Sequence, residues 1–215
     1  MKTILCFGDS NTYGESPEGF GRYQRAERWP GILREALGPA YDVIEEGCNG
    51  RTTIWEDPVE GNESGLNHLG GCLKSHAPLD LVILMLGTND LKARFSVTPA
   101  DIALSVERLV RTIFATPNER RQRPPQVLLA SPTFVRPTTF LGEVFGNRYE
   151  DSLRLGPLYA QAAMRCGAAF IDVAKVSPPS ELDGLHFDRD GHRLVAHAME
   201  QKVRAMLEDE GGAPL

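Results

Sequence analysis

The chain has 215 residues, of which 41% are hydrophobic and 24% are charged, and its formal net charge is −6. This length suits one domain with a full core and is short for two, so we expect a single domain over residues 1–215. The net negative charge argues against a nucleic-acid partner, because binding to polyphosphate depends on lysine and arginine.

The longest apolar run is LVILML at residues 81–86, which is far too short to span a bilayer, so we expect no membrane partner. The N-terminal apolar segment lacks a small-residue cleavage site, and the cytoplasm is therefore the expected location. The cysteines form no C-x-x-C pair, which predicts free thiols rather than disulfides or zinc ligands at Cys6, Cys48, Cys72 and Cys166.

Short apolar runs bounded by turn residues predict five strands, at residues 3–7, 41–45, 79–86, 126–130 and 168–173. Helical patterns lie between most of them. In the clearest, Thr98 fits an N-cap, Pro99 fits the first helical position, and apolar residues repeat along one face. Further helices are predicted at residues 29–37, 149–166 and 191–207.

Strands that alternate with helices imply right-handed crossovers and a parallel sheet covered on both faces. The sequence therefore predicts an α/β fold, namely a three-layer α/β/α sandwich with a five-stranded parallel sheet. Residues from about 208 onward are expected to fray. Two stretches without clear periodicity, residues 56–71 and 135–148, are predicted to be long loops with a functional or interface role.

Four polar clusters lie just beyond predicted strands, where the carboxyl ends of a parallel sheet share one edge. GDSN at residues 8–11 follows the first strand, and DGLH at residues 183–186 follows the last. GCNGRT at residues 47–52 and GTND at residues 87–90 follow the second and third strands. We expect these clusters to meet in space.

Together the clusters contain the groups that acyl transfer requires. A serine hydroxyl such as that of Ser10 becomes nucleophilic when a base accepts its proton and a third group orients the base. His186 and Asp183 suit these two roles. The backbone N–H groups of Ser10 and Gly50 and the side-chain amide of Asn89 are candidate oxyanion-hole donors.

Each cluster also has an ordinary structural interpretation. Gly-Asp-Ser commonly forms a turn or a helix N-cap, and a single histidine in a loop is most often solvated. The coincidence of all four clusters at one sheet edge favours the catalytic interpretation. His192 is interpreted as a surface residue rather than a base. Candidate substrate-binding residues next to the site are Asp9, Asn11, Tyr13 and Trp55.

At these residues the sequence resembles the SGNH hydrolases, also called the GDSL family. The four blocks of that family match in order: Gly8-Asp9-Ser10, Gly50, Gly87-x-Asn89-Asp90 and Asp183-x-x-His186. Within the family, VIEEGCNGRTT at residues 43–53 and LDLVILMLGTNDLKARF at residues 79–95 are similar to the bacterial arylesterase and acyltransferase group, which includes perhydrolases.

The resemblance implies a flavodoxin-like sheet, with Ser10 as nucleophile, His186 as base and Asp183 as its partner. The serine chemistry expected here needs no metal and no organic cofactor. The resemblance also implies a homo-oligomer, by family resemblance an octamer, in which a neighbouring subunit narrows the active-site entrance near residues 135–148.

The predicted function is a serine esterase that hydrolyses small short-chain acyl esters through an acyl-serine intermediate, with acyl transfer or perhydrolysis as a related activity. A deacetylase of acetylated sugars, a lysophospholipase and a thioesterase would use the same triad. A non-enzyme alternative is a flavodoxin-like module that holds a phosphate or flavin in the loop at residues 10–14. That alternative leaves Asp183 and His186 without a role.

Overall fold

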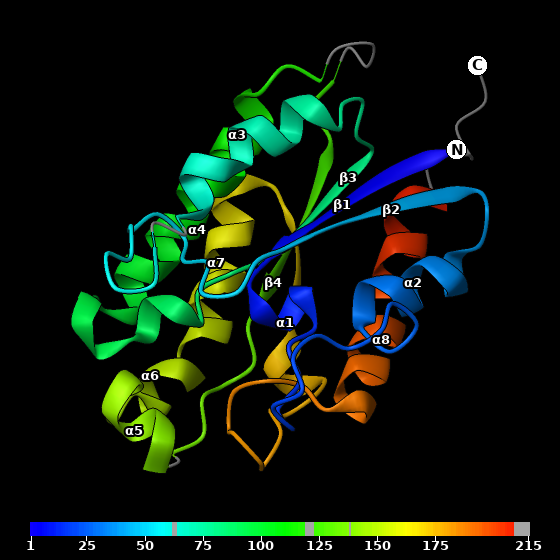
Figure 1. Cartoon of the computed structure of the whole chain (residues 1–215). Coiled ribbons are helices and arrows are strands. Elements are labelled where there is room, and N and C mark those ends of the chain that lie inside the picture. The colour runs from blue at the N-terminus through cyan, green and yellow to red at the C-terminus, as the bar shows by residue number, and fades with distance from the viewer. Residues whose placement is uncertain (62–63, 119–122, 138, 209–215) are drawn as a thin grey trace.

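A computed structural model describes residues 1–61, 64–118, 123–137 and 139–208 (Figure 1). Its centre is a sheet of five parallel strands in the order β2-β1-β3-β4-β5. The strands are β1 (Lys2–Gly8), β2 (Tyr41–Gly47), β3 (Leu81–Met85), β4 (Gln126–Ser131) and β5 (Ala169–Asp172). All five predicted strands are present, so the predicted five-stranded parallel sheet is confirmed.

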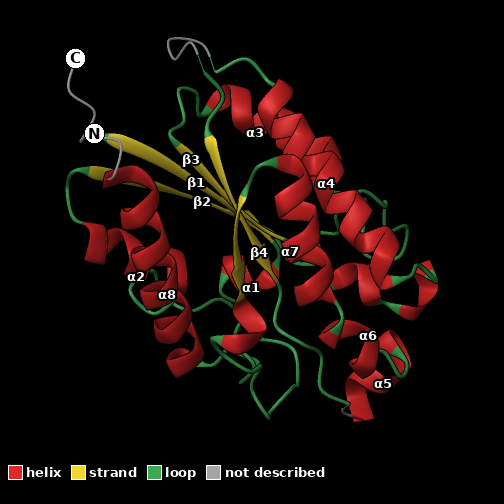
Figure 2. Ribbon diagram, turned by 180° about the vertical axis from the view of Figure 1, so that it is seen from behind, coloured by secondary structure: helices red, strands yellow, loops and turns green. Residues whose placement is uncertain are grey.

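Helices cover both faces of the sheet and complete the predicted three layers (Figure 2). The helices α2 (Trp29–Leu37) and α8 (Arg189–Glu208) pack on one face. The opposite face is covered by α3 (Gly65–Ser75), α4 (Pro99–Ala115) and α7 (Leu155–Cys166). The remaining short helices are α1 (Ser10–Tyr13), α5 (Thr139–Phe145), α6 (Tyr149–Leu153), η1 (Asn89–Leu91), η2 (Ala93–Phe95) and η3 (Val173–Lys175).

The strand sequences are apolar because helices bury both faces of the sheet. Alternate residues of β1 point to opposite sides: Ile4 and Cys6 join the core beneath α2 and α8, whereas Leu5 and Phe7 join the core beneath α3, α4 and α7. Every residue of β3 is buried. Thr98 caps α4 in a capping box with Asp101, which confirms the predicted start of that helix.

Both predicted long loops contain a helix. The stretch at residues 56–71 leads into α3, whose sequence GLNHLGGCLKS has low helix propensity because of its glycines. Leu69 and Leu73, one helical turn apart, pack into the core and stabilise α3 through tertiary contact. The stretch at residues 135–148 contains α5, and the predicted helix at 149–166 is divided at Arg154 into α6 and α7. The tail expected to fray lies, beyond Glu208, outside the described residues.

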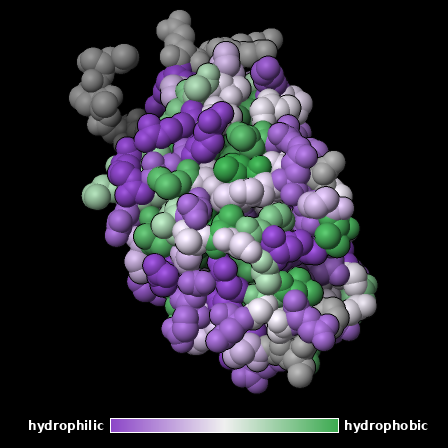
Figure 3. Space-filling model, turned by 90° about the vertical axis from the view of Figure 1, so that its left-hand side faces the viewer, coloured by the Kyte–Doolittle hydropathy of each residue, from purple (hydrophilic) through white to green (hydrophobic). Residues whose placement is uncertain are grey.

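The surface shown in Figure 3 carries hydrophobic residues in small groups between hydrophilic ones. Within the described residues, no helix is long and apolar enough to cross a membrane. The four cysteines are thiols, as predicted, with Cys6 fully buried and the other three partly buried.

The surface position expected for His192 is wrong. Its side chain is fully buried between α8 and α2, and the Trp29 N–H donates a hydrogen bond of 3.2 Å to its Nδ1. The rings of Tyr23 and Phe187 contact it edge-on, with centroid distances of 5.4 and 5.6 Å. Burial, reinforced by the charges of His186 and Arg28, lowers the pKa of His192 to about 3.

We predict that His192 makes the fold less stable in acid. In the unfolded chain the His192 imidazole is protonated below its ordinary pKa of 6.5, whereas in the folded chain its pKa is about 3. Between these two pH values protonation therefore favours the unfolded chain, and the free energy of unfolding falls as the pH drops. Between about pH 7.5 and about pH 5, His192 lowers the free energy of unfolding by about 2 kcal/mol. The variant His192→Asn keeps an acceptor for the Trp29 N–H. Its free energy of unfolding, measured with urea at both pH values, should therefore decrease by about 2 kcal/mol less than that of the wild type.

The matched control for this measurement is His197→Asn, because the side chain of His197 lies on the same helix and is 69% exposed. This variant should lose stability in acid as the wild type does. An equal acid-induced loss in wild type and His192→Asn would contradict the assignment.

Candidate active site

Ser10 lies at the carboxyl end of β1, as the first residue of the short helix α1. The Asp9 side chain caps this helix by accepting a hydrogen bond of 3.0 Å from the Asn11 N–H. A Cβ at Gly8 would lie 2.1 Å from the Thr12 hydroxyl oxygen, and one at Gly47 would lie 2.1 Å from the Tyr13 nitrogen. Only glycine at these positions allows α1 to sit against the ends of β1 and β2.

His186 and Asp183 come from the loop between η3 and α8 and complete a hydrogen-bonded chain with Ser10. The His186 Nε2 lies 2.9 Å from the Ser10 Oγ, and its Nδ1 lies 2.6 Å from the Asp183 Oδ2. An ionised Asp183 can only accept, so the ring proton belongs on Nδ1 and leaves Nε2 free to accept the serine proton.

Asp183 also orders its own loop. Its Oδ1 accepts hydrogen bonds from the backbone N–H groups of Leu185 and His186, at 2.9 and 3.0 Å. Burial raises the pKa of the Asp183 carboxyl, but the hydrogen bonds from the His186 ring, Leu185 and the His186 backbone outweigh it and hold that pKa below its ordinary value. Asp183 is therefore ionised at neutral pH.

Asn11 holds the loop that carries His186 (residues 176–188, here called the histidine loop) against α1. Its Nδ2 donates to the Leu185 carbonyl at 3.1 Å, and its Oδ1 accepts from the Phe187 N–H at 3.0 Å. These two partners flank His186 in the sequence, and the Asn11 side chain is buried. The amide therefore fixes the backbone on both sides of the base.

The three predicted oxyanion-hole residues, Ser10, Gly50 and Asn89, line one cavity. Gly50 has a φ of 76°, a conformation that favours glycine, and follows β2. Asn89 begins η1 after β3, and its Nδ2 donates a hydrogen bond of 3.1 Å to the Arg51 carbonyl. Among the described residues, the N–H groups of Ser10 and Gly50 donate to no acceptor. The arrangement offers donors to an oxygen that develops negative charge.

Arg51 and Asp90 follow Gly50 and Asn89 directly in the sequence, and they bind different partners rather than each other. Arg51 donates to the carbonyl oxygens of Gly8 at 2.9 Å and of Glu46, which ties the loop after β2 to β1. Asp90 accepts from the Thr53 N–H, at 3.0 and 3.1 Å, and from its hydroxyl. Burial raises the pKa of Asp90 to about 6 although these hydrogen bonds oppose the shift.

The cavity above Ser10 has a volume of about 320 Å³. Val144 and Phe145 of α5 and Leu185 form an apolar side. Besides the candidate catalytic and oxyanion-hole residues, the cavity is lined by four polar residues, which we call its polar wall: Glu15, Asn49, Glu60 and Lys92. The Lys92 ammonium lies 2.6 Å from a Glu60 carboxylate oxygen, and Asn49 donates to Glu15 at 2.8 Å. Both stretches predicted to be functional loops thus contribute to the cavity, through Glu60 and through Val144 and Phe145, although the sequence pattern assigned none of these residues to the site.

None of the four predicted substrate-binding residues lines this cavity. Asp9 and Asn11 are buried and hold the backbone of α1 and of the histidine loop. The Tyr13 ring lies under the Arg22 guanidinium at 4.1 Å. Trp55 lines a separate hollow with Ile54, Val97 and Leu104.

The geometry at α1 also bears on the phosphate-binding alternative. A phosphate at residues 10–14 would need the N–H groups at the start of α1, and the Asp9 carboxylate already accepts one of them. This arrangement favours a nucleophile at Ser10 over an anion site there.

Known proteins resemble this chain both in sequence and in structure. The sequence model of the GDSL-like Lipase/Acylhydrolase family matches residues 6–194. The structure is similar to that of an aryl esterase from M. smegmatis bound to an inhibitor, with 37% identity, a TM-score of 0.91, and coverage of 96% of this chain and 100% of that one.

It is also similar to a carbohydrate acetylesterase family member from Sinorhizobium meliloti, with 36% identity, a TM-score of 0.93, and coverage of 97% of this chain and 100% of that one. No match is found among curated proteins. These comparisons confirm the family resemblance and the ester hydrolase class predicted from the sequence. The chain therefore belongs to the GDSL-like lipase/acylhydrolase family and is a carboxylic ester hydrolase.

Proposed function

We propose that the chain hydrolyses short-chain acyl esters through an acyl-enzyme formed on Ser10. The observation that carries this proposal is the continuous hydrogen-bonded chain from Asp183 through His186 to Ser10, which ends at a cavity lined by oxyanion-hole donors. A cavity of about 320 Å³ is at the small end of ligand sites, which favours a compact acyl group over a long lipid chain.

In this mechanism the Ser10 Oγ attacks the carbonyl carbon while its proton passes to the His186 Nε2. The carbonyl oxygen becomes negative and accepts hydrogen bonds from the Ser10 and Gly50 N–H groups and the Asn89 amide. The C–O bond to the alcohol then breaks, and His186 returns the proton to the leaving oxygen. Water repeats these steps on the acyl-serine and releases the acid. Asp183 remains ionised and stabilises the imidazolium.

A second candidate is removal of acetyl groups from carbohydrates. The polar wall of the cavity supports it, because Glu15, Asn49 and Lys92 offer acceptors and donors to a hydroxyl-rich alcohol. The Sinorhizobium meliloti protein, which covers nearly the whole chain, is described as a carbohydrate acetylesterase family member.

Acyl transfer to an alcohol or to hydrogen peroxide would use the same acyl-serine. It depends on excluding water from that intermediate, and the polar wall offers water several partners, so we propose hydrolysis as the main reaction. The homo-oligomer and the cytoplasmic location stay predictions from the sequence.

Replacing the nucleophile tests the mechanism. We expect Ser10→Ala to lower kcat for p-nitrophenyl acetate by about 10³-fold or more, because the remaining groups cannot form the acyl-enzyme. Ser75→Ala, an exposed serine at the end of α3, should hydrolyse this ester at the wild-type rate. Circular dichroism would verify folding, and a folded Ser10→Ala enzyme with undiminished kcat would refute the proposal.

Loosening the histidine loop tests the contribution of Asn11. We expect Asn11→Ala to lower kcat for p-nitrophenyl acetate by about 10- to 100-fold with KM within about twofold, because His186 loses alignment while the cavity keeps its lining. The control is Asn67→Ala, because the Asn67 side chain is exposed and, in the described structure, makes one hydrogen bond, from its Nδ2 to Glu56 at 2.7 Å. This variant should keep the wild-type kcat. Equal kcat values for the two variants would remove the positioning role.

A substrate panel separates the two candidate functions. If the polar wall binds sugar hydroxyls, Asn49→Ala should lower kcat/KM for acetylated glucose by up to about tenfold, because one hydrogen bond to the substrate is lost. Its kcat/KM for phenyl acetate should stay within about twofold of wild type. A wild-type enzyme that hydrolyses phenyl acetate but no acetylated sugar would rule out the second candidate.

A further inference from the structure

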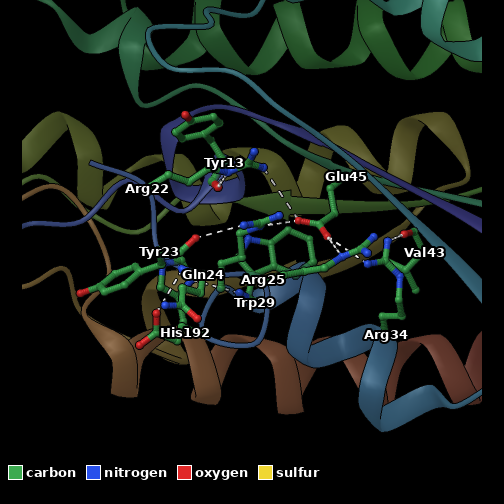
Figure 4. Close-up of polar contacts among 12 residues, drawn as sticks. Tyr13, Arg22, Tyr23, Gln24, Arg25, Trp29, Arg34, Val43, Glu45 and His192 are labelled. Atoms are coloured by element: carbon green, nitrogen blue, oxygen red, sulfur yellow. Dashed lines mark hydrogen bonds and ion pairs between the residues drawn. The ribbon is translucent and has the colours of Figure 1, made fainter. Parts of the chain in front are cut away.

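Four arginines gather around a single glutamate, and Figure 4 shows three of them, Arg22, Arg25 and Arg34, beside it. The glutamate is Glu45 of β2, whose side chain is 7% exposed. Its Oε1 lies 3.0 Å from Arg25 and 3.1 Å from Arg34, and its Oε2 lies 2.5 Å from Arg28 and 3.9 Å from Arg22. We call these five residues the arginine cluster.

The arginine cluster carries more positive charge than its surroundings neutralise. Within the described parts of the chain, Glu45 is the only carboxylate within 4.0 Å of these four guanidinium groups, which leaves three positive charges uncompensated. Four acids on neighbouring segments bind elsewhere: Glu46 contacts His76, Glu18 and Glu27 contact Arg189, and Glu15 accepts from Asn49. Such an excess is notable in a chain of net charge −6.

Two of the arginines are held by the protein and two are open to solvent. Arg34 donates to Glu45 and the Val43 carbonyl, and Arg28 donates to Glu45 and the Tyr23 carbonyl. Arg25 donates to Glu45 only through Nε, and its side chain is 64% exposed. Arg22 donates through Nε to the Tyr13 carbonyl and is 35% exposed. In the described structure, the terminal nitrogens of Arg25 and Arg22 donate no hydrogen bond.

At Arg22, repulsion from a neighbouring arginine adds to a larger effect of burial. Partial burial, and to a smaller extent the nearby charge of Arg28, lower the pKa of the Arg22 guanidinium, although Tyr13 and Glu45 raise it. A dianion beside Arg22 and Arg25 would relieve this repulsion. Paired guanidinium N–H groups match the oxygens of phosphate and sulfate, which can accept several such bonds at once.

We propose that Arg22 and Arg25, supported by Arg28, bind a tetrahedral oxyanion of the phosphate class. The site is distinct from the catalytic cavity but adjoins its rim. Arg22 forms an isolated β-bridge with Glu15, whose side chain lines the cavity, and its guanidinium covers Tyr13 of α1. The oxyanion is either free phosphate or a phosphoryl group on a larger molecule.

Isothermal titration calorimetry with inorganic phosphate, at ionic strength held constant with sodium chloride, tests the site. We expect saturable binding to wild type and affinities lowered by about tenfold in Arg25→Gln and in Arg22→Gln, the loss expected for removing one charge-assisted contact. Arg111→Gln is the matched control, because Arg111 is 63% exposed and also pairs with a nearly buried glutamate, Glu107. It should bind phosphate within about twofold of wild type.

Glucose 6-phosphate distinguishes the two sources of the oxyanion. Tighter binding than inorganic phosphate, still weakened by Arg25→Gln, assigns the site to a phosphoryl group on a larger molecule, and equal or weaker binding assigns it to the free ion. Absence of saturable phosphate binding, or equal affinities for Arg25→Gln and Arg111→Gln, would overturn the proposal. Hydrolysis of p-nitrophenyl acetate by both variants reports separately on the catalytic site.

Discussion

The shared direction of the five strands is the constraint on which the active site depends. Because all strands are parallel, their carboxyl ends lie along one edge of the sheet, and the segments that follow them meet there. Ser10 follows β1, Gly50 follows β2, Asn89 follows β3, and His186 returns from beyond β5 to reach Ser10 across 176 residues of sequence. An antiparallel arrangement would send half of these segments to the opposite edge.

The residues around the catalytic groups serve mainly to fix the backbone. Asp9 caps α1, Asn11 holds both sides of the His186 backbone, and Arg51 ties the loop after β2 to the end of β1. These side chains are buried and hydrogen-bonded to backbone groups, an arrangement that resists displacement because breaking it would leave polar atoms unsatisfied. The proposed reaction needs this rigidity at the hydrogen bond between Ser10 and His186, since small misalignments slow proton transfer.

Charge is distributed unevenly around the same edge of the sheet. In the cavity wall Lys92 pairs with Glu60, whereas the Glu15 carboxylate accepts a hydrogen bond from Asn49 and has no cation within 4.0 Å among the described residues. On the other side of Tyr13, the arginine cluster has an excess of positive charge. The candidate catalytic cavity and the arginine cluster therefore differ in the sign of their excess charge.

The sequence by itself determined the fold class and indicated the candidate catalytic groups, because both leave local signals. Continuous apolar runs indicate strands buried on both faces, and Gly-Asp-Ser and Asp-x-x-His form compact motifs whose order along the chain is specific. Tertiary structure alone decided the rest. Helix α3 depends on Leu69 and Leu73 packing into the core rather than on its glycine-rich sequence, and His192 is buried because its face of α8 meets α2. The cavity wall combines Glu15, Asn49, Glu60 and Phe145 from four distant segments, and single-residue patterns carry no information about which segments will meet.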